Sequence, residues 1–221
     1  MADELTPGPD ATQRRPSAAF PAVLAVLFLL ATPVSYVGAY DRLTWWLETL
    51  PALLALPALA LAWPRWRLSN LLLVFIFLHA LILLTGGHYT YARVPLGDWA
   101  AHAFGWTRNN FDKLGHLAQG FVPALLTREI LLRWSPFRQT PRSLFVPVMA
   151  VACPLAFSAF YEIIEWWVAL ATGTAATDFL GTQGDPWDTQ SDMLFALVGA
   201  LAAVTLMGRA HDRSIARVEG R

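Results

Sequence analysis

The sequence predicts an all-α fold, a polytopic membrane protein built as a bundle of six transmembrane helices. Of its 221 residues, 56% are hydrophobic and only 14% are charged, and the mean hydropathy is positive at +0.44. Soluble globular domains are less apolar and more charged than this. The chain also contains repeated apolar runs near the roughly 20 residues that a helix needs to cross a hydrocarbon core of about 30 Å. We therefore expect the protein to contact membrane lipid and no nucleic acid.

The six apolar runs cover residues 18–39, 45–62, 68–84, 111–132, 144–171 and 189–207. They divide the chain into a proline-containing N-terminal tail at 1–17 that we expect to be flexible, a transmembrane domain at 18–208, and a C-terminal tail at 209–221. The first three runs carry few polar groups, which is typical of scaffold helices. The second half of the chain is therefore expected to hold the chemistry.

The distribution of basic residues predicts the orientation. With six spans both termini lie on one side, and placing them in the cytoplasm leaves only Arg42, Arg93, Arg108 and Lys113 outside, of 16 basic residues. Because Lys and Arg concentrate in cytoplasmic loops, we predict a bacterial inner (cell) membrane protein with both termini cytoplasmic. The rival interpretation of the first run is a signal peptide cleaved after the small residues 37–39. Its length favours an uncleaved anchor.

Ionisable residues cluster at the outer ends of the last three predicted helices. Acid groups at bilayer depth are costly unless a cation, a partner or water compensates them. Asp112 and His116 share a helix face at i, i+4, and two glutamates follow at i, i+3 on the next helix. Asp185, followed by proline, is predicted to be the N-cap of the last helix, which would align three aspartates. The seven candidate metal-ligating residues are Asp112, His116, Glu162, Glu165, Asp185, Asp188 and Asp192.

This ligand set suits a divalent cation. Oxygen ligands with one imidazole favour Mg²⁺, Mn²⁺ or Ca²⁺, and Zn²⁺ less because only one histidine is well placed. As an enzyme, the protein would use the cation to activate water, with Glu162, Glu165 and Asp192 as candidate catalytic residues acting on a lipid or lipid-linked envelope substrate. The alternative is a non-enzymatic carrier or ion-binding protein that uses the same pocket.

A purely structural polar cluster is the third interpretation. Glu162 and Glu165 would then point to different neighbours, and Asp185 and Asp188 would bond only to backbone amides at the start of the last helix. Asp112 would cap the fourth helix, while Lys113 would extend toward the lipid headgroups. This explanation is weaker for the two glutamates and Asp192, because none of them lies in the first turn of a helix.

The loop before the fourth span supplies four candidate substrate-binding residues, His88, Tyr89, Arg93 and Arg108. The two arginines could hold a phosphate headgroup through bidentate hydrogen bonds. They could equally pair with the acids of the pocket. The sequence does not distinguish these roles, and it says nothing of the oligomeric state.

Five strings of residues resemble the YjdF-like family of bacterial inner-membrane proteins. They are 88–91 (HYTY), 108–113 (RNNFDK), 116–123 (HLAQGFVP), 158–167 (SAFYEIIEWW) and 180–185 (LGTQGD). The resemblance covers nearly the whole chain beyond the N-terminal tail. It implies a location in the inner membrane and no particular activity.

A looser resemblance is to VanZ-like membrane proteins. Asp112, His116, Asp188, Asp192 and Gly199 occupy places comparable to that pattern. The asparagine that usually follows the second aspartate of the pattern is not evident here. The similarity implies at most a shared bundle with a polar pocket linked to envelope lipids or cell-wall components.

Overall fold

The protein is described by a computed structural model that covers residues 18–140, 143–173 and 177–220, and every regular element in these ranges is helical. The predicted all-α fold is therefore confirmed. The expected flexible tail at 1–17 lies outside the described residues. The elements in chain order are α1 (Ala19–Tyr36), α2 (Arg42–Ala62), α3 (Asn70–Tyr89), α4 (Pro95–Phe104), α5 (Phe111–Trp134), the 3-10 turn η1 (Pro136–Gln139), α6 (Phe145–Thr172), α7 (Thr177–Leu180) and α8 (Asp188–Glu219).

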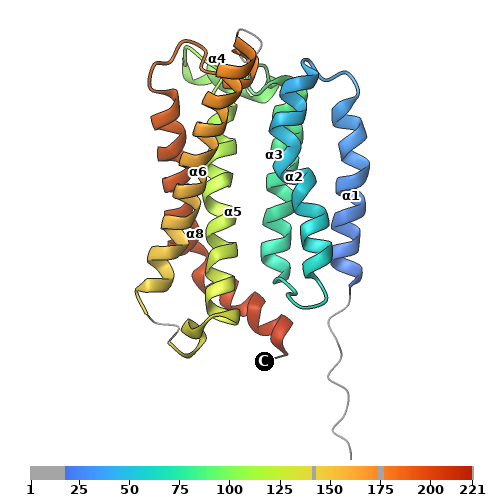
Figure 1. The fold of residues 1–221 in the computed structure, drawn as a ribbon, viewed down its shortest axis with the longest axis vertical. Helices are drawn as coiled ribbons and strands as arrows, with labels where there is room; N and C mark the ends of the chain where they lie inside the picture. The colour runs from blue at the N-terminus through green and yellow to red at the C-terminus, as the bar shows by residue number, and fades with distance from the viewer. Residues whose placement is uncertain (1–17, 141–142, 174–176, 221) are drawn as a thin grey trace, which may run out of the picture.

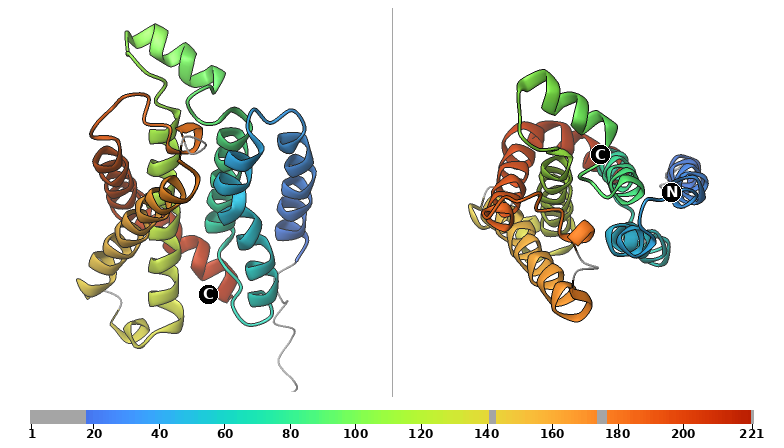
Figure 2. Two further views of the ribbon diagram at one scale, coloured as in Figure 1. Left: turned by 45° about the horizontal axis from the view of Figure 1, so that its top comes forward. Right: turned by 90° about the horizontal axis from the view of Figure 1, so that it is seen from above.

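The long helices form a bundle with two halves. Helices α1, α2 and α3 lie on one side, and α5, α6 and α8 lie on the other (Figure 1). Helix α5 is central, because it packs against α3, α6 and α8. Helix α4 lies across one end of the bundle, which we call the α4 end, and both described termini lie at the opposite end, which we call the termini end (Figure 2).

Each of the six predicted runs lies in a long helix, but among the described helices five are long and apolar enough to cross a membrane: α1, α2, α3, α6 and α8. The exception is α5, which spans 24 residues and buries the charged residues Lys113, Glu129 and Arg133. The predicted count of six apolar spans is therefore not exact, because α5 is not apolar enough to be one of them. The physical reason is its central position, because a helix surrounded by other helices presents polar side chains to protein rather than to lipid.

Two glycines let α5 and α8 approach closely. A Cβ atom at Gly120 would lie 1.8 Å from the carbonyl oxygen of Ala196, and one at Gly199 would lie 2.0 Å from that of Leu117. Any side chain at either position would therefore force the helices apart. Small residues serve the same purpose at helix contacts in membrane proteins generally. The close approach sets the register in which the polar side chains of α5 and α8 meet.

A buried apolar layer fills the bundle between α3, α5 and α8. It includes Leu72, Leu125, Ala200 and Ala203, all of which are fully buried. Beyond this layer α8 continues to Glu219, well past the predicted end of the span at 207, and its last turns cross beneath the bundle (Figure 1). The predicted C-terminal tail thus continues the helix as far as the structure describes it.

The starts of two helices differ from expectation. Helix α8 begins at Asp188 with Trp187 at the N-cap, so the prediction that Asp185 caps this helix is wrong. Helix α5 begins after Asn110, which makes no side-chain capping bond, and Asp112 lies inside its first turn. Both aspartates pair with Arg108, and each also accepts one backbone hydrogen bond, Asp112 from the Lys113 amide and Asp185 from the Trp187 amide.

Candidate functional site

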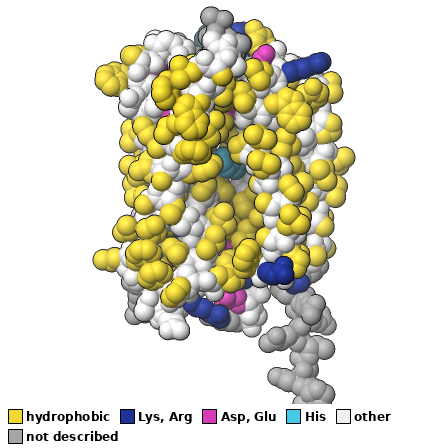
Figure 3. Space-filling model, viewed as in Figure 1, with side chains coloured by type: hydrophobic (Ala, Val, Ile, Leu, Met, Phe, Trp, Pro, Cys, Tyr) yellow, Lys and Arg dark blue, Asp and Glu magenta, His cyan; other side chains and the backbone are white. Residues whose placement is uncertain are grey.

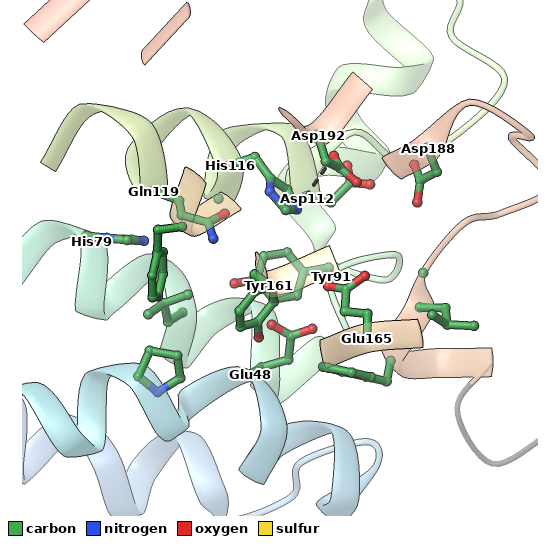
Figure 4. A pocket seen from close by; sticks show the side chains of 17 residues that line it. Glu48, His79, Tyr91, Asp112, His116, Gln119, Tyr161, Glu165, Asp188 and Asp192 are labelled. Carbon is green, nitrogen blue, oxygen red and sulfur yellow. Dashed lines mark ion pairs between the residues drawn. The ribbon is translucent and has the colours of Figure 1, made fainter. Parts of the chain in front are cut away.

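A polar pocket lies between the two halves of the bundle, toward the α4 end (Figure 4). Water-sized molecules can occupy about 70 Å³ of it, which is room for several waters at roughly 10–15 Å³ of such volume each. Helices α2, α3, α5, α6 and α8 all contribute lining residues. The polar ones are Glu48, His79, Tyr91, Asp112, His116, Gln119, Tyr161, Glu165, Asp188 and Asp192.

Lys113 compensates the aspartates at the upper wall of this pocket. Its ammonium nitrogen lies 2.8 Å from Asp188 Oδ1 and 2.7 Å from Asp192 Oδ1, and 3.6 Å from Asp112 Oδ2. The residue is only 7% exposed. The expectation that Lys113 extends toward the headgroups is therefore wrong, because three carboxylates inside the bundle bind the ammonium more strongly than water does.

Arg108 completes the compensation from the loop before α5. It pairs with Asp112, with Asp188 at 2.6 Å and with Asp185 at 3.3 Å. Asp185 also accepts a hydrogen bond from the Trp187 amide at 2.9 Å. The structural interpretation in which Asp185 and Asp188 bond only to backbone amides is therefore wrong. Of the two roles expected for Arg108, binding a phosphate headgroup or pairing with the acids of the pocket, the structure therefore shows the second.

The loop that carries Asp185 is fastened to the segment before α5. The Asn109 amide donates to Gln183 Oε1 at 3.0 Å, and Gln183 Nε2 donates back to the Asn109 carbonyl at 2.8 Å. Gln183 adopts a left-handed conformation with φ of 49°, which is uncommon for a residue other than glycine. This reciprocal pair holds Arg108 and Asp185 close to each other.

Three ligand atoms remain close together on the inner side of Lys113. One ligand atom each from His116, Glu162 and Asp192 lies within 4.8 Å of the other two, and His116 Nε2 is 3.6 Å from Asp192 Oδ1. Glu162 Oε1 and His116 Nδ1 are buried without a hydrogen-bond partner in the described part of the chain. An unpartnered buried polar atom is costly, so a ligand that bonded to these two atoms would stabilise the protein.

A second candidate group, Asp112, Asp188 and Asp192, also brings three ligand atoms within 4.8 Å. The ammonium of Lys113 already bonds to two of these side chains. A metal ion there would have to displace a buried cation. The group with His116 and Glu162 shares only Asp192 with Lys113, and its other two members each keep an unpartnered buried atom, so it is the better candidate metal centre.

Glu162 and Glu165 are three residues apart in α6 but point to different neighbours, as the structural interpretation of the cluster predicted. Glu165 lies across the pocket beside Glu48, Tyr91 and Tyr161 (Figure 4). Among the described residues we find no ion pair to either glutamate or to Glu48. Glu48 and Glu165 are therefore acids of the pocket lining without an ion pair, and Glu162 is a third such acid beside the lining, close to His116 and Asp192.

Glu48 and His79 were missed by sequence reasoning, which treated the first three spans as scaffold. Glu48 is 8% exposed and, like His79, lines the pocket. The sequence feature that could have identified them is that each stands alone in an apolar run. Glu48 is the one acid in the second run, and His79 is the one ionisable residue in the third. Ionisable groups inside a membrane bundle mark functional sites by default.

The remaining candidate substrate-binding residues lie outside the pocket lining. His88 Nδ1 is 2.7 Å from the Ser35 carbonyl oxygen, and the Tyr89 ring stacks edge-on against His88 at 4.5 Å. The guanidinium of Arg93 lies over the Tyr40 ring at 4.0 Å. These side chains connect α3 and the loop after it to the end of α1. Their proposed role in substrate binding stays a prediction.

A second polar cluster, also missed, lies at the termini end. Glu129 Oε1 accepts hydrogen bonds from the Ser69 amide at 2.8 Å and from Arg133 at 2.5 Å. Glu129 Oε2 accepts from Ser69 Oγ at 2.6 Å and lies 2.9 Å from His211 Nε2. Arg133 also donates to the Arg67 carbonyl at 2.6 Å. Every carboxylate oxygen here has two partners, which leaves no free coordination position.

The comparisons with known proteins agree on one family. A family model described as "Predicted membrane protein (DUF2238)" matches residues 20–213. The inner membrane protein YjdF of Escherichia coli (strain K12) is 50% identical over 196 residues, which cover 89% of this chain and 91% of the relative. No solved structure matches. The similarity to VanZ-like proteins stays a prediction. With five apolar helices and a relative in the inner membrane, the chain belongs to the DUF2238 family of predicted membrane proteins.

Proposed function

We propose that the protein binds a divalent cation at His116, Glu162 and Asp192 and uses it to act on a lipid or lipid-linked substrate in the envelope. The observation that carries the proposal is the pair of buried, unpartnered ligand atoms, Glu162 Oε1 and His116 Nδ1, in a group whose ligand atoms lie within 4.8 Å of one another. A cation would supply the missing partner of Glu162 Oε1 and would share Asp192 with Lys113, whose ammonium lies 2.7 Å from Asp192 Oδ1. Two carboxylates and one imidazole suit Mg²⁺ or Mn²⁺, with Ca²⁺ as a further candidate.

The surroundings of the group supply what metal-assisted hydrolysis requires. The cavity has room for several waters, so a bound cation would have a water to activate. Glu165 and Glu48 line the same cavity and carry no compensating cation in the described ranges. Either carboxylate is placed to accept the proton that an activated water releases.

Access from the membrane supports a lipid-borne substrate. The pocket is lined by Pro51 from α2 and Phe157 from α6 as well as by the polar residues. The flank of the molecule is covered with hydrophobic side chains, and a histidine is visible in a recess at mid-height between the two halves (Figure 3). A substrate whose headgroup enters such a recess can leave its acyl chains in the bilayer.

Metal analysis of the purified full-length protein tests the proposal. We expect the parent protein, equilibrated with Mn²⁺ and passed through a desalting column, to retain one equivalent of metal, and the Glu162→Gln variant to retain none. The Asp212→Asn variant is the matched control, because Asp212 is an exposed acid paired with Arg128 at the termini end. Equal retention by the parent and Glu162→Gln, or no retention by either, would refute the cation site.

Activity requires a separate measurement. Proteoliposomes with lipid-linked phosphates and Mn²⁺ should release phosphate with the parent and the Asp212→Asn variant, and not with Glu162→Gln. Metal retention without product would instead favour the ion-binding or carrier function. One observation opposes transport: the fully buried apolar layer of Leu72, Leu125, Ala200 and Ala203 lies between the pocket and the polar cluster at the termini end.

A further inference from the structure

We propose that the groove between α1, α3 and α8 at the termini end binds an anionic phospholipid, with an acyl chain along its apolar wall and the phosphate on Arg213 and Arg217. The groove encloses about 540 Å³. It is separate from the pocket at the α4 end, with which it shares no lining residue. The inference therefore stands independently of the proposed metal chemistry.

The wall of the groove is apolar. Its surface comes mainly from Phe20 of α1, Leu71, Val74 and Phe75 of α3, and Met207 of α8. Phe75 is held in place by its ring contact with Phe121 at 4.9 Å. A concave apolar wall that spans three helices accepts a hydrocarbon chain more fully than a flat helix face does.

The rim of the groove is basic. Arg213 and Arg217 are both exposed and lie at i, i+4 on α8, so their guanidinium groups project from the same face. No carboxylate of the described residues lines the groove. Among the described residues neither arginine has an acidic partner, whereas Arg128 pairs with Asp212 at 2.7 Å and Arg133 pairs with Glu129 at 2.5 Å. The two rim arginines are thus available to an external anion.

The rim is also held rigidly against the bundle. Ser214, between the two arginines, accepts a hydrogen bond from the Leu71 amide at 3.1 Å, and Ile215 on the following turn is buried. This docking fixes the arginines above the apolar wall. An anionic group beside a hydrocarbon chain is the chemistry of a phospholipid, and basic pockets between helices on the cytoplasmic side recognise such headgroups. The termini end is the side that the basic-residue count predicts to be cytoplasmic.

Lipid binding by the purified full-length protein tests this site. In nanodiscs of phosphatidylcholine with added cardiolipin or phosphatidylglycerol, the parent should bind the anionic lipid, and the Arg213→Gln/Arg217→Gln double variant should bind it about 30-fold more weakly, from roughly 1 kcal/mol per arginine. The Arg209→Gln variant is the matched control, because Arg209 is exposed on the same helix but does not line the groove. It should bind like the parent.

Two further arms identify the ligand. Val74→Trp fills the apolar wall and should weaken lipid binding while both arginines remain; unchanged binding would refute the acyl-chain position. Inorganic phosphate should not compete at millimolar concentration; full competition would indicate a free-anion site and overturn the proposal. Equal binding by the double variant would also overturn it. Lipid binding that appears only after residues 2–17 are deleted would also overturn the proposal, because the N-terminal segment of the chain, rather than lipid, would then be the occupant of the groove.

Discussion

The two polar clusters of this bundle differ in how completely their carboxylates are partnered. At the termini end, both oxygens of Glu129 are bonded twice, to Ser69 and Arg133 on one side and to Ser69 and His211 on the other. At the α4 end, Lys113 and Arg108 satisfy four aspartates, but Glu162 retains a buried oxygen without a partner. Both clusters lie inside an apolar chain, and both join helices that are distant in sequence.

The difference teaches which cluster is structural and which has capacity for a ligand. A saturated buried network stabilises the arrangement that it bonds and has nothing left to offer. A network with unpartnered atoms around a cavity costs stability unless something else completes it. The apolar layer that includes Leu72 and Leu125 lies between them, so the clusters can be disturbed one at a time.

The largest effect is expected from the saturated cluster. Glu129→Ala removes the carboxylate that compensates Arg133 and His211, both of which are buried. Arg133 keeps only its longer pair with Glu219 at 3.4 Å, and the buried groups of Ser69 and His211 lose their partner, which should lower the free energy of unfolding by about 3–5 kcal/mol. SDS titration of the purified variant measures this loss, with Asp212→Asn as the control at an exposed acid on the same end. A loss no greater than that of the control would mean that the network is not structural.

A smaller loss is expected at the partnered side of the pocket. Lys113→Met keeps a long apolar stem but removes the ammonium that bonds Asp188 and Asp192. We expect about 2–3 kcal/mol, less than for Glu129, because Arg108 still compensates Asp188 at 2.6 Å. The Lys113→Met/Asp192→Asn double variant should recover part of the loss in the same titration. Strictly additive losses would show that the two side chains do not interact.

The unpartnered glutamate should behave in the opposite way. Glu162→Gln replaces an acid that lacks a partner at one buried oxygen, so in a chelator the variant should unfold within about 1 kcal/mol of the parent or be more stable. Thermal unfolding with and without Mn²⁺ measures this, and only the parent should gain stability from the metal. A variant strongly destabilised in chelator would place Glu162 with Glu129 as a structural residue.

The sequence predicted the long helices and most of the α4-end site because both follow from local patterns. Apolar runs of the right length predict helices whatever their neighbours are. Acids spaced at i, i+3 or i, i+4 predict shared faces, and Asp112, His116, Asp188 and Asp192 do line one pocket. Two of the predicted residues do not line it. Glu162 lies beside the pocket with His116 and Asp192, and Asp185 lies in the loop that the bonds between Asn109 and Gln183 hold, so that α8 starts later.

Partners between distant helices could not be predicted in this way. Lys113 could point outward or inward on its own helix, and only the packing of α8 against α5 decides that it meets Asp192. The Glu129 cluster brings together residues from three separate stretches of the chain, with no spacing to indicate it. Glu48 could have been predicted from the sequence as a site residue, because a single acid in an apolar run has to be either compensated by a partner or functional.

The smallest effect is expected at the rim of the pocket, where Asp185 is the third and longest ion pair of Arg108 at 3.3 Å. Its side chain is 32% exposed, so water screens the pair, and exposed pairs contribute roughly 0–1 kcal/mol. Asp185→Asn keeps an oxygen for the Trp187 amide and should change the free energy of unfolding by less than about 0.5 kcal/mol. SDS titration beside Lys113→Met makes the test, since both variants remove one charge from the same network. If Asp185→Asn lowers the free energy of unfolding as much as Lys113→Met does, exposure to water does not weaken the pair between Arg108 and Asp185. The loop at 181–187 would then belong to the buried site rather than to its rim.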